Sequence, residues 1–154
     1  MTNRTHRTYS DEETKTLAAE FARTLLGGEV IFLQGELGSG KTTFVRGAAQ
    51  ALGFHEPVRS PTFTIVQRYP VVHGAIRQLL HVDLYRLKDP SELTALALEE
   101  DLGQPDTVTF IEWPDVVTLP WKADATIQLK AISQTGRAIS ILLLPPRVKS
   151  HQPS

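Results

Sequence analysis

Residues 35–42, Gly-Glu-Leu-Gly-Ser-Gly-Lys-Thr, follow the pattern G-x-x-x-x-G-K-[ST] in full. The unbroken apolar run at residues 30–33 precedes them and predicts a central strand that is covered on both faces. A helix is expected from about residue 41 to 52, with Gly53 as its C-terminal stop. Because a glycine-rich loop between a buried strand and a helix binds phosphate groups, this segment predicts a nucleotide-binding α/β domain.

Each fixed position of this loop has a physical role. The glycines allow the backbone to turn its N–H groups toward phosphate oxygens. Lys41 places a positive charge against the β- and γ-phosphates and is therefore an expected catalytic residue, and the Thr42 hydroxyl is expected to coordinate Mg²⁺. The residues of this segment that we expect to bind ATP are Glu36, Leu37, Gly38, Ser39, Gly40, Lys41, Thr42 and Thr43.

The remaining patterns predict one α/β domain over residues 1–144, in which helices flank a mixed, mostly parallel sheet. A capping box starting at Ser10 begins a first helix that glycines at 27–28 stop, and the first few residues are expected to be loose. Further elements are expected as strands at 62–69, 79–84 and 108–111, a helix at 91–102, and a terminal hairpin of strands 125–131 and 138–144. The polar, proline-rich residues 145–154 are expected to be disordered.

Composition narrows the classes of function. The chain has 154 residues, a size that suits one domain, and its net charge of −1 argues against a protein that grips nucleic acid alone. It has no cysteine, so disulfides and cysteine-based zinc sites are excluded. No segment approaches the ~20 apolar residues that span a bilayer, and the polar N-terminus is not a secretory signal, so we expect a soluble cytosolic domain.

Two carboxylates stand at strand ends downstream of the loop. Asp83 and Glu112 each close an apolar run, where an enzyme of this class holds Mg²⁺ or orients the attacking water. Spacing alone leaves open which of them holds the metal. His81 lies on the same side of its strand as Asp83 and is interpreted as structural.

Four motifs together resemble the TsaE family. They are the loop with its following residues at 35–44, Ser-Pro-Thr-Phe-Thr at 60–64, His-Val-Asp-Leu-Tyr-Arg-Leu at 81–87 and Ile-Glu-Trp-Pro at 111–114, and the similarity spans residues 10–144. The resemblance implies a bacterial cytoplasmic ATPase that hydrolyses Mg-ATP in complex with TsaD and TsaB. Those partners add a threonylcarbamoyl group to an adenosine beside the tRNA anticodon, so tRNA would be reached only through the complex.

The resemblance also implies roles for single residues. Thr42 and Glu112 would coordinate Mg²⁺, and Asp83 would assist hydrolysis. Thr62 would act as a catalytic switch residue near the γ-phosphate, although a simple turn before a strand is an equal alternative. Ser10 and its neighbours would bind adenine. Arg137 in the final hairpin would bind the nucleotide, although a solvated arginine in a turn is at least an equal alternative. Trp113 would stack on a partner or shape the site, although core packing is the default interpretation.

Two other functions remain open at this stage. A small-molecule kinase would use the same loop, but residues 86–103 are short, acidic and poor in the arginines that a kinase lid carries. A nucleotide-dependent binding switch with slow hydrolysis would share the site and differ in turnover. Phosphate transfer to a metabolite would favour the kinase, and hydrolysis that rises when partners are added would favour the switch.

Overall fold

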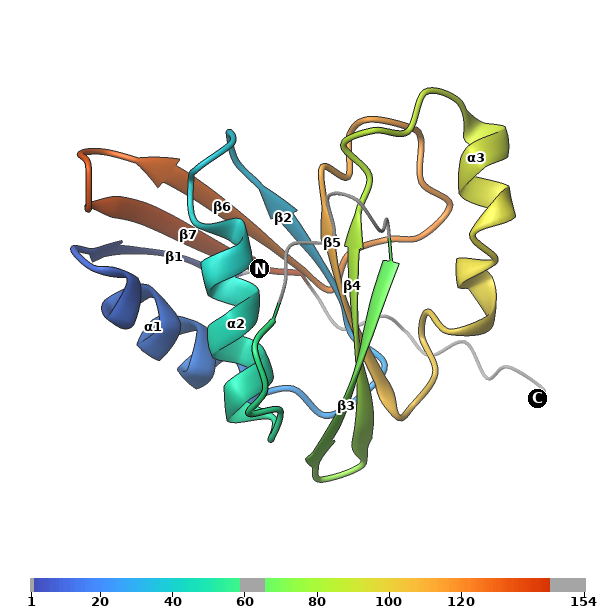
Figure 1. The fold of residues 1–154 in the computed structure, drawn as a ribbon, viewed down its shortest axis with the longest axis horizontal. Coiled ribbons are helices and arrows are strands. Elements are labelled where there is room, and N and C mark those ends of the chain that lie inside the picture. Colours follow the sequence, from blue (N-terminus) through green and yellow to red (C-terminus); the bar gives the residue numbers. More distant parts are fainter. Residues whose placement is uncertain (1, 59–65, 145–154) are drawn as a thin grey trace.

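The structure is a computed structural model that describes residues 2–58 and 66–144, and its centre is one seven-stranded sheet (Figure 1). The strand order across the sheet is β1-β7-β6-β2-β5-β4-β3. The strands are β1 (Thr2–Thr8), β2 (Val30–Gln34), β3 (Val66–His73), β4 (Ile76–Asp83), β5 (Thr107–Glu112), β6 (Ala125–Ala131) and β7 (Arg137–Leu143).

Parallel pairing is confined to the middle of the sheet. β2 pairs in parallel with β5 and with β6, and β5 pairs in parallel with β4. The outer pairs, β1 with β7, β7 with β6, and β4 with β3, are antiparallel. The expected mixed α/β sheet with a C-terminal hairpin is confirmed, and its parallel part carries the carboxyl ends of β2, β4 and β5 to one edge.

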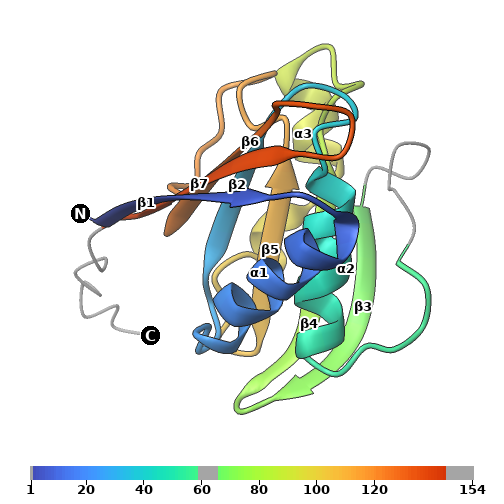
Figure 2. The ribbon, with the colours of Figure 1, turned by 90° about the vertical axis from the view of Figure 1, so that its left-hand side faces the viewer.

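The sheet separates two apolar layers. On one face α1 (Asp11–Arg23) and α2 (Lys41–Ala51) pack against alternate residues of the strands, among them Ile31, Leu79 and Phe110. On the other face α3 (Pro90–Ala95) and a short 3₁₀ helix, η1 (Leu98–Glu100), cover Val82 and Ile111. Figures 1 and 2 show α1 and α2 side by side on one side of the sheet and α3 on the opposite side.

The N-terminal strand corrects one expectation. Residues 2–8 are not loose, because β1 pairs along its whole length with β7, from Thr2 opposite Leu143 to Thr8 opposite Arg137. Its sequence is polar and lacks the apolar alternation of a half-buried strand. β1 is held by backbone hydrogen bonds to a strand at the far end of the sequence, which local patterns do not reveal.

The helix expected at 91–102 is also wrong as a single element. Asp89 caps α3 by accepting hydrogen bonds from the N–H groups of Ser91 and Glu92, but the helix ends before Ala97, which has a φ of 51°. Leu93 and Leu98 both pack into the second apolar layer. An unbroken helix would place these two side chains about 140° apart around its axis, so the break lets both face the sheet.

The first helix begins as expected and ends earlier. The Ser10 hydroxyl accepts a hydrogen bond from the Glu13 N–H at 3.1 Å, and the Glu13 carboxylate accepts one from the Tyr9 N–H at 2.9 Å. The helix ends at Arg23 with Thr24 as its cap, ahead of the glycines at 27–28. Within the described residues no helix is long and apolar enough to cross a membrane.

Candidate nucleotide-binding site

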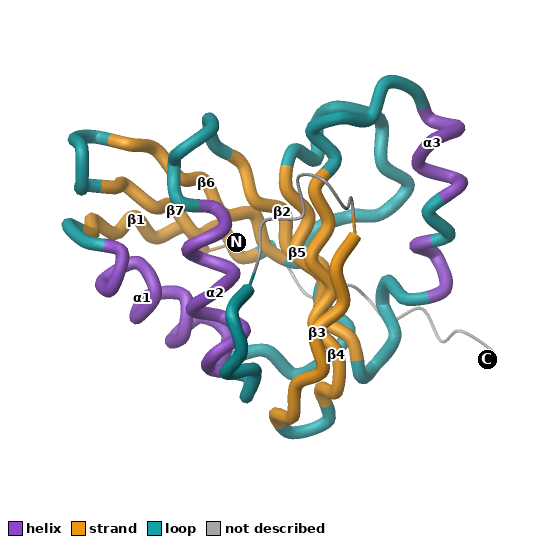
Figure 3. Tube along the Cα trace, viewed as in Figure 1, coloured by secondary structure: helices purple, strands orange, loops and turns teal. Residues whose placement is uncertain are grey.

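The loop at residues 35–40 leads directly from β2 into α2, as the sequence predicts (Figure 3). Gly38 and Gly40 have φ values of 78° and 102°, a left-handed backbone that favours glycine. Gly40 caps α2 without a side-chain hydrogen bond, and the first turn of α2 contains no acidic residue. The N–H groups at this end of the helix therefore remain suited to an anion, which the helix dipole also attracts.

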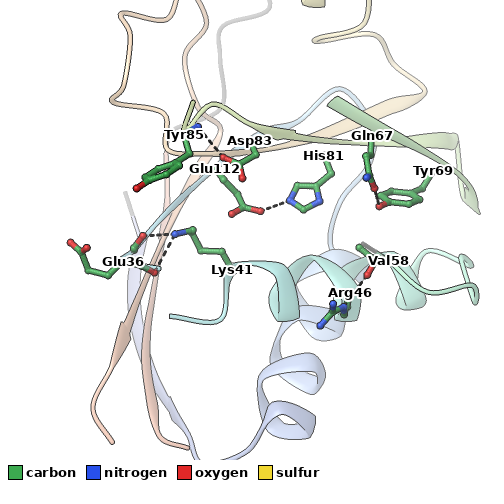
Figure 4. A network of polar contacts seen from close by, with 11 residues as sticks. Glu36, Lys41, Arg46, Val58, Gln67, Tyr69, His81, Asp83, Tyr85 and Glu112 are labelled. Atoms are coloured by element: carbon green, nitrogen blue, oxygen red, sulfur yellow. Dashed lines mark hydrogen bonds and ion pairs between the residues drawn. The ribbon is translucent and has the colours of Figure 1, made fainter. Parts of the chain in front are cut away.

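Lys41 folds back over the loop that precedes it. Its ammonium group donates hydrogen bonds to the carbonyl oxygens of Gly35 and of Glu36, the latter at 3.3 Å (Figure 4). The side chain is buried, and this desolvation lowers the pKa of Lys41, although the nearby charges of Glu112, Asp83 and Glu36 act in the opposite direction. The lysine is thus held beside the phosphate loop, next to two strand-end carboxylates.

Those carboxylates come from neighbouring parallel strands. Asp83 ends β4 and Glu112 ends β5, and the strand register places the two residues opposite each other. Both are buried. Burial is the largest cause that raises the pKa of Asp83, with the charge of Glu112 adding to it, while the Tyr85 N–H that donates to Asp83 at 2.9 Å lowers it. The sequence-predicted acids therefore meet Lys41 at one edge of the sheet.

His81 is a member of this cluster that sequence reasoning missed. Its Nε2 donates a hydrogen bond to Oε2 of Glu112, and its ring is completely buried (Figure 4). The signal was available, because His81 stands two residues before Asp83 and thus on the same face of β4. The structure adds to the interpretation of His81 as structural a hydrogen bond to Glu112 on the adjacent strand.

Trp113 also contributes to the site and not to the core. The residue is only partly buried, and its ring lies under the Lys41 ammonium at 4.2 Å from the ring centroid. Its other neighbour is Tyr85, at 4.9 Å between ring centroids. Trp113 has a φ of 59°, an uncommon conformation for a bulky residue. This conformation occurs immediately after Glu112, the last residue of β5.

Arg137 reaches the phosphate loop from the final hairpin. Its guanidinium donates to the Gly38 carbonyl at 3.2 Å and to the Gly136 carbonyl at 2.8 Å. The pairing of β1 with β7 sets Thr8 opposite Arg137, so Ser10 and the start of α1 follow from the same edge of the sheet. Two segments that the sequence resemblance links to the nucleotide, at opposite ends of the chain, are therefore neighbours through β1.

The other loop residues have different surroundings. Glu36, Leu37 and Gly38 are exposed, Thr42 and Thr43 are partly buried, and Ser39 is buried with a hydroxyl that has no hydrogen-bond partner within the described residues. Beside the loop lies a hollow of about 300 Å³, lined by Gln34, Gly35, Glu36, Trp113, Pro114, Asp115 and Val116. Thr62, the expected switch residue, lies outside the described residues, as does the tail from residue 145.

The available side chains suit Mg²⁺. In the described part of the chain, no group of three or more His, Cys, Asp and Glu side chains gathers as a metal cage. Thr42 and Glu112 would supply a hydroxyl and a carboxylate oxygen, the hard ligands that Mg²⁺ prefers, and its sites usually include phosphate oxygens and water. The donor set therefore fits a metal that binds together with a nucleotide.

Comparison with known proteins assigns the chain to a family. The family model for TsaE, described as threonylcarbamoyl adenosine biosynthesis protein, matches residues 8–139. The chain belongs to the TsaE family. A TsaE from Aquifex aeolicus is 52% identical over 134 residues, covering 86% of this chain and 90% of the relative. One from Bacillus subtilis is 42% identical over 112 residues, covering 72% and 66% of the two chains.

A solved structure supports the same assignment. The crystal structure of YdiB from Bacillus subtilis superposes with a TM-score of 0.74 at 32% identity, covering 94% of this chain and 87% of that one. The TsaE relatives are named for biosynthesis of threonylcarbamoyladenosine in tRNA. Membership of the TsaE family thus connects this fold to a tRNA-modification pathway, and the resemblance drawn from the four motifs is confirmed.

Proposed function

We propose that this chain is a Mg²⁺-dependent ATP hydrolase that acts with TsaD and TsaB in the threonylcarbamoyladenosine modification of tRNA. The observation that carries the proposal is the meeting of Lys41, Asp83 and Glu112 at the end of a glycine loop, where α2 begins without a side-chain cap. Phosphoryl transfer requires positioning and charge neutralisation, so Lys41 would supply positive charge and the two carboxylates would position the metal and the attacking water.

Each residue of the site has a proposed role that follows from its position. Lys41 would leave the loop carbonyls and bind the β- and γ-phosphates, while the N–H groups of residues 38–43 surround the phosphate chain. Thr42 and Glu112 would hold Mg²⁺, which neutralises phosphate charge when bound. Asp83, whose pKa is raised by burial, is a better proton acceptor than an exposed aspartate and would orient the attacking water.

Other expected contacts complete the proposal. Arg137 and the Ser10 region would bind the remainder of the nucleotide from the edge formed by β1 and β7. Thr62 would sense the γ-phosphate, and its replacement by alanine should leave ATP binding nearly intact while partner-stimulated hydrolysis falls. With a net charge of −1, the chain is proposed to reach tRNA only through its partners.

The experiment measures ATP binding and release of inorganic phosphate by the purified chain, with and without Mg²⁺ and with and without TsaD and TsaB. We expect Mg²⁺-dependent binding, slow hydrolysis alone and faster hydrolysis with the partners. Depletion of the protein in cells should lower the threonylcarbamoyladenosine content of tRNA. Absence of Mg²⁺-dependent ATP binding, transfer of the γ-phosphate to a metabolite, or tight binding of isolated tRNA would each contradict the proposal.

A further inference from the structure

The buried pair of His81 and Glu112 links the interior of the sheet to the nucleotide site. His81 is 0% exposed and Glu112 is 3% exposed. Their hydrogen bond joins Nε2 of the imidazole to Oε2 of the carboxylate. Since a carboxylate only accepts, the proton in this bond is carried by Nε2.

This bond engages one oxygen of the carboxylate and limits rotation of the group. In the described part of the chain, the hydrogen bond to His81 is the one that Glu112 makes with a side chain. Figure 4 shows the carboxylate between the His81 ring and the Lys41 side chain, and the charge of Glu112 acts on Lys41 more strongly than those of Asp83 and Glu36. The second oxygen, Oε1, is thus the one left for a ligand on the nucleotide side.

Core stability gives no reason for a histidine at this position. Its neighbours on the same face of the sheet include Leu79 and Phe110, both completely buried. The other ring nitrogen, Nδ1, is buried without a hydrogen-bond partner among the described residues. A buried polar atom without a partner costs about 1–3 kcal/mol, so an apolar side chain would suit the core better. The contact with Glu112 is the hydrogen bond that His81 makes among the described residues, and it is what distinguishes histidine from an apolar side chain here.

We propose that His81 is a positioning residue that orients the Glu112 carboxylate for Mg²⁺ bound with the nucleotide. This inference rests on the proposed function, because it assumes that Glu112 faces the metal. Groups that hydrogen-bond a metal ligand fix its orientation, and their loss lowers metal affinity by roughly 10- to 100-fold. His81 does not touch nucleotide or metal in this proposal and acts through Glu112 alone.

Three replacements of His81 separate orientation from packing. In His81→Gln the amide nitrogen stands where Nε2 stands and can still donate to Glu112. In His81→Asn the amide nitrogen stands at the position of Nδ1, and the shorter side chain cannot reach the Glu112 carboxylate. His81→Leu removes both polar atoms and leaves the buried Glu112 carboxylate without this hydrogen bond, so thermal unfolding is needed to establish that the variant is folded. Thr109→Val is the matched control, because it removes a buried hydroxyl without a partner from β5 on the opposite face.

The measurement is binding of a fluorescent ATP analogue, first in EDTA and then as a function of Mg²⁺ concentration, with thermal unfolding of each variant. In His81→Asn and His81→Leu, we expect that half of the Mg²⁺-dependent increase in analogue binding will require about 10- to 100-fold more Mg²⁺ than in wild type. The Kd for the analogue in EDTA should stay within about twofold of the wild-type value. His81→Gln should restore the wild-type requirement within about threefold, and Thr109→Val should equal wild type.

Two outcomes overturn the inference. The first is that His81→Asn needs the same Mg²⁺ concentration for analogue binding as Thr109→Val. The second is that His81→Asn and His81→Gln raise the required Mg²⁺ concentration by the same factor. In both of these cases wild type still shows Mg²⁺-dependent binding, and the proposed function stands. If wild type itself shows no Mg²⁺ dependence, the proposed function fails, and the inference fails with it.

Discussion

The Lys41 ammonium lies between the carbonyls of its own loop and the face of the Trp113 ring, 4.2 Å from the ring centroid. The lysine that would bind phosphate is therefore already held by weaker partners: two neutral carbonyl oxygens and an aromatic face. A phosphate group competes well with such partners, because its negative charge adds an ion-pair attraction that a neutral carbonyl oxygen cannot offer to the ammonium.

Replacement of Lys41 by alanine should remove ATP hydrolysis and weaken ATP binding. The loss of a charged donor to phosphate costs about 1.5–3 kcal/mol, which is roughly a 10- to 100-fold increase in Kd. Isothermal titration calorimetry and phosphate release would measure both effects. Lys130→Ala, which changes an exposed lysine on β6, is the control and should bind ATP like wild type. Full hydrolysis by Lys41→Ala would contradict the assignment of the phosphate loop.

Trp113 should report nucleotide binding by its fluorescence, because binding of ATP would move Lys41 away from its ring. The chain has two tryptophans, Trp113 and Trp121, which makes the signal assignable. We expect the emission change on adding Mg-ATP to persist in Trp121→Phe and to vanish in Trp113→Phe. A change that is retained in Trp113→Phe and lost in Trp121→Phe would contradict the expectation that the signal comes from the contact of Lys41 with Trp113.

Alanine replacements of the two acids should separate their roles. Glu112→Ala should raise the Mg²⁺ concentration needed for nucleotide binding by about tenfold or more, because it removes a metal ligand. Asp83→Ala should leave that requirement near the wild-type value and lower hydrolysis by about 10²- to 10⁴-fold, as expected for loss of a general base. Titration of Mg²⁺ in the presence of a fluorescent ATP analogue measures the metal requirement of each variant, and phosphate release measures its rate of hydrolysis. The reverse pattern would exchange the two roles.

Asp83→Asn should stabilise the nucleotide-free protein in a pH-dependent way. Burial raises the native pKa of Asp83 above its ordinary value of 3.8, so ionisation of this carboxyl disfavours the native state. That penalty is absent below pH 3.8, grows as the pH rises toward the native pKa and is complete above it. Asparagine can still accept the Tyr85 N–H. The difference in Tm between Asp83→Asn and wild type, followed from about pH 8 to about pH 4, should therefore shrink as the pH falls. A difference that is constant with pH would contradict this account.

Gly47→Ala should destabilise the packing of α1 on α2. A Cβ atom at Gly47 would lie 2.5 Å from the Lys15 carbonyl oxygen and 2.6 Å from Lys15 Cα. Overpacking of this kind costs about 1–3 kcal/mol, which opposes the gain of about 1 kcal/mol that alanine has over glycine in a helix. We expect a lower urea midpoint, with Gln50→Ala on the exposed side of the same helix within about 0.5 kcal/mol of wild type. An unchanged midpoint would mean that the two helices can separate without loss.

The phosphate loop and the strands that precede the acids were predictable because their signals are local. The glycines of residues 35–40 and the apolar runs before Gly35 and Glu112 determine the backbone near themselves, and parallel strands bring their carboxyl ends together. Lys41, Asp83 and Glu112 could therefore be placed at one site from the sequence alone. β1 could not, because its polar residues become a strand only through hydrogen bonds to β7.

Other contacts within the site were decided by the tertiary structure alone. The bond between His81 and Glu112 depends on the register of β4 against β5, and the position of Trp113 depends on a φ of 59° at the end of β5. The contact of Arg137 with Gly38 joins residues 99 positions apart in the chain. Local sequence determined the elements and the chemistry that each brings to the edge of the sheet. Strand pairing across the sheet depends on packing and hydrogen bonds between distant parts of the chain, and it determined which partner each side chain of the site has.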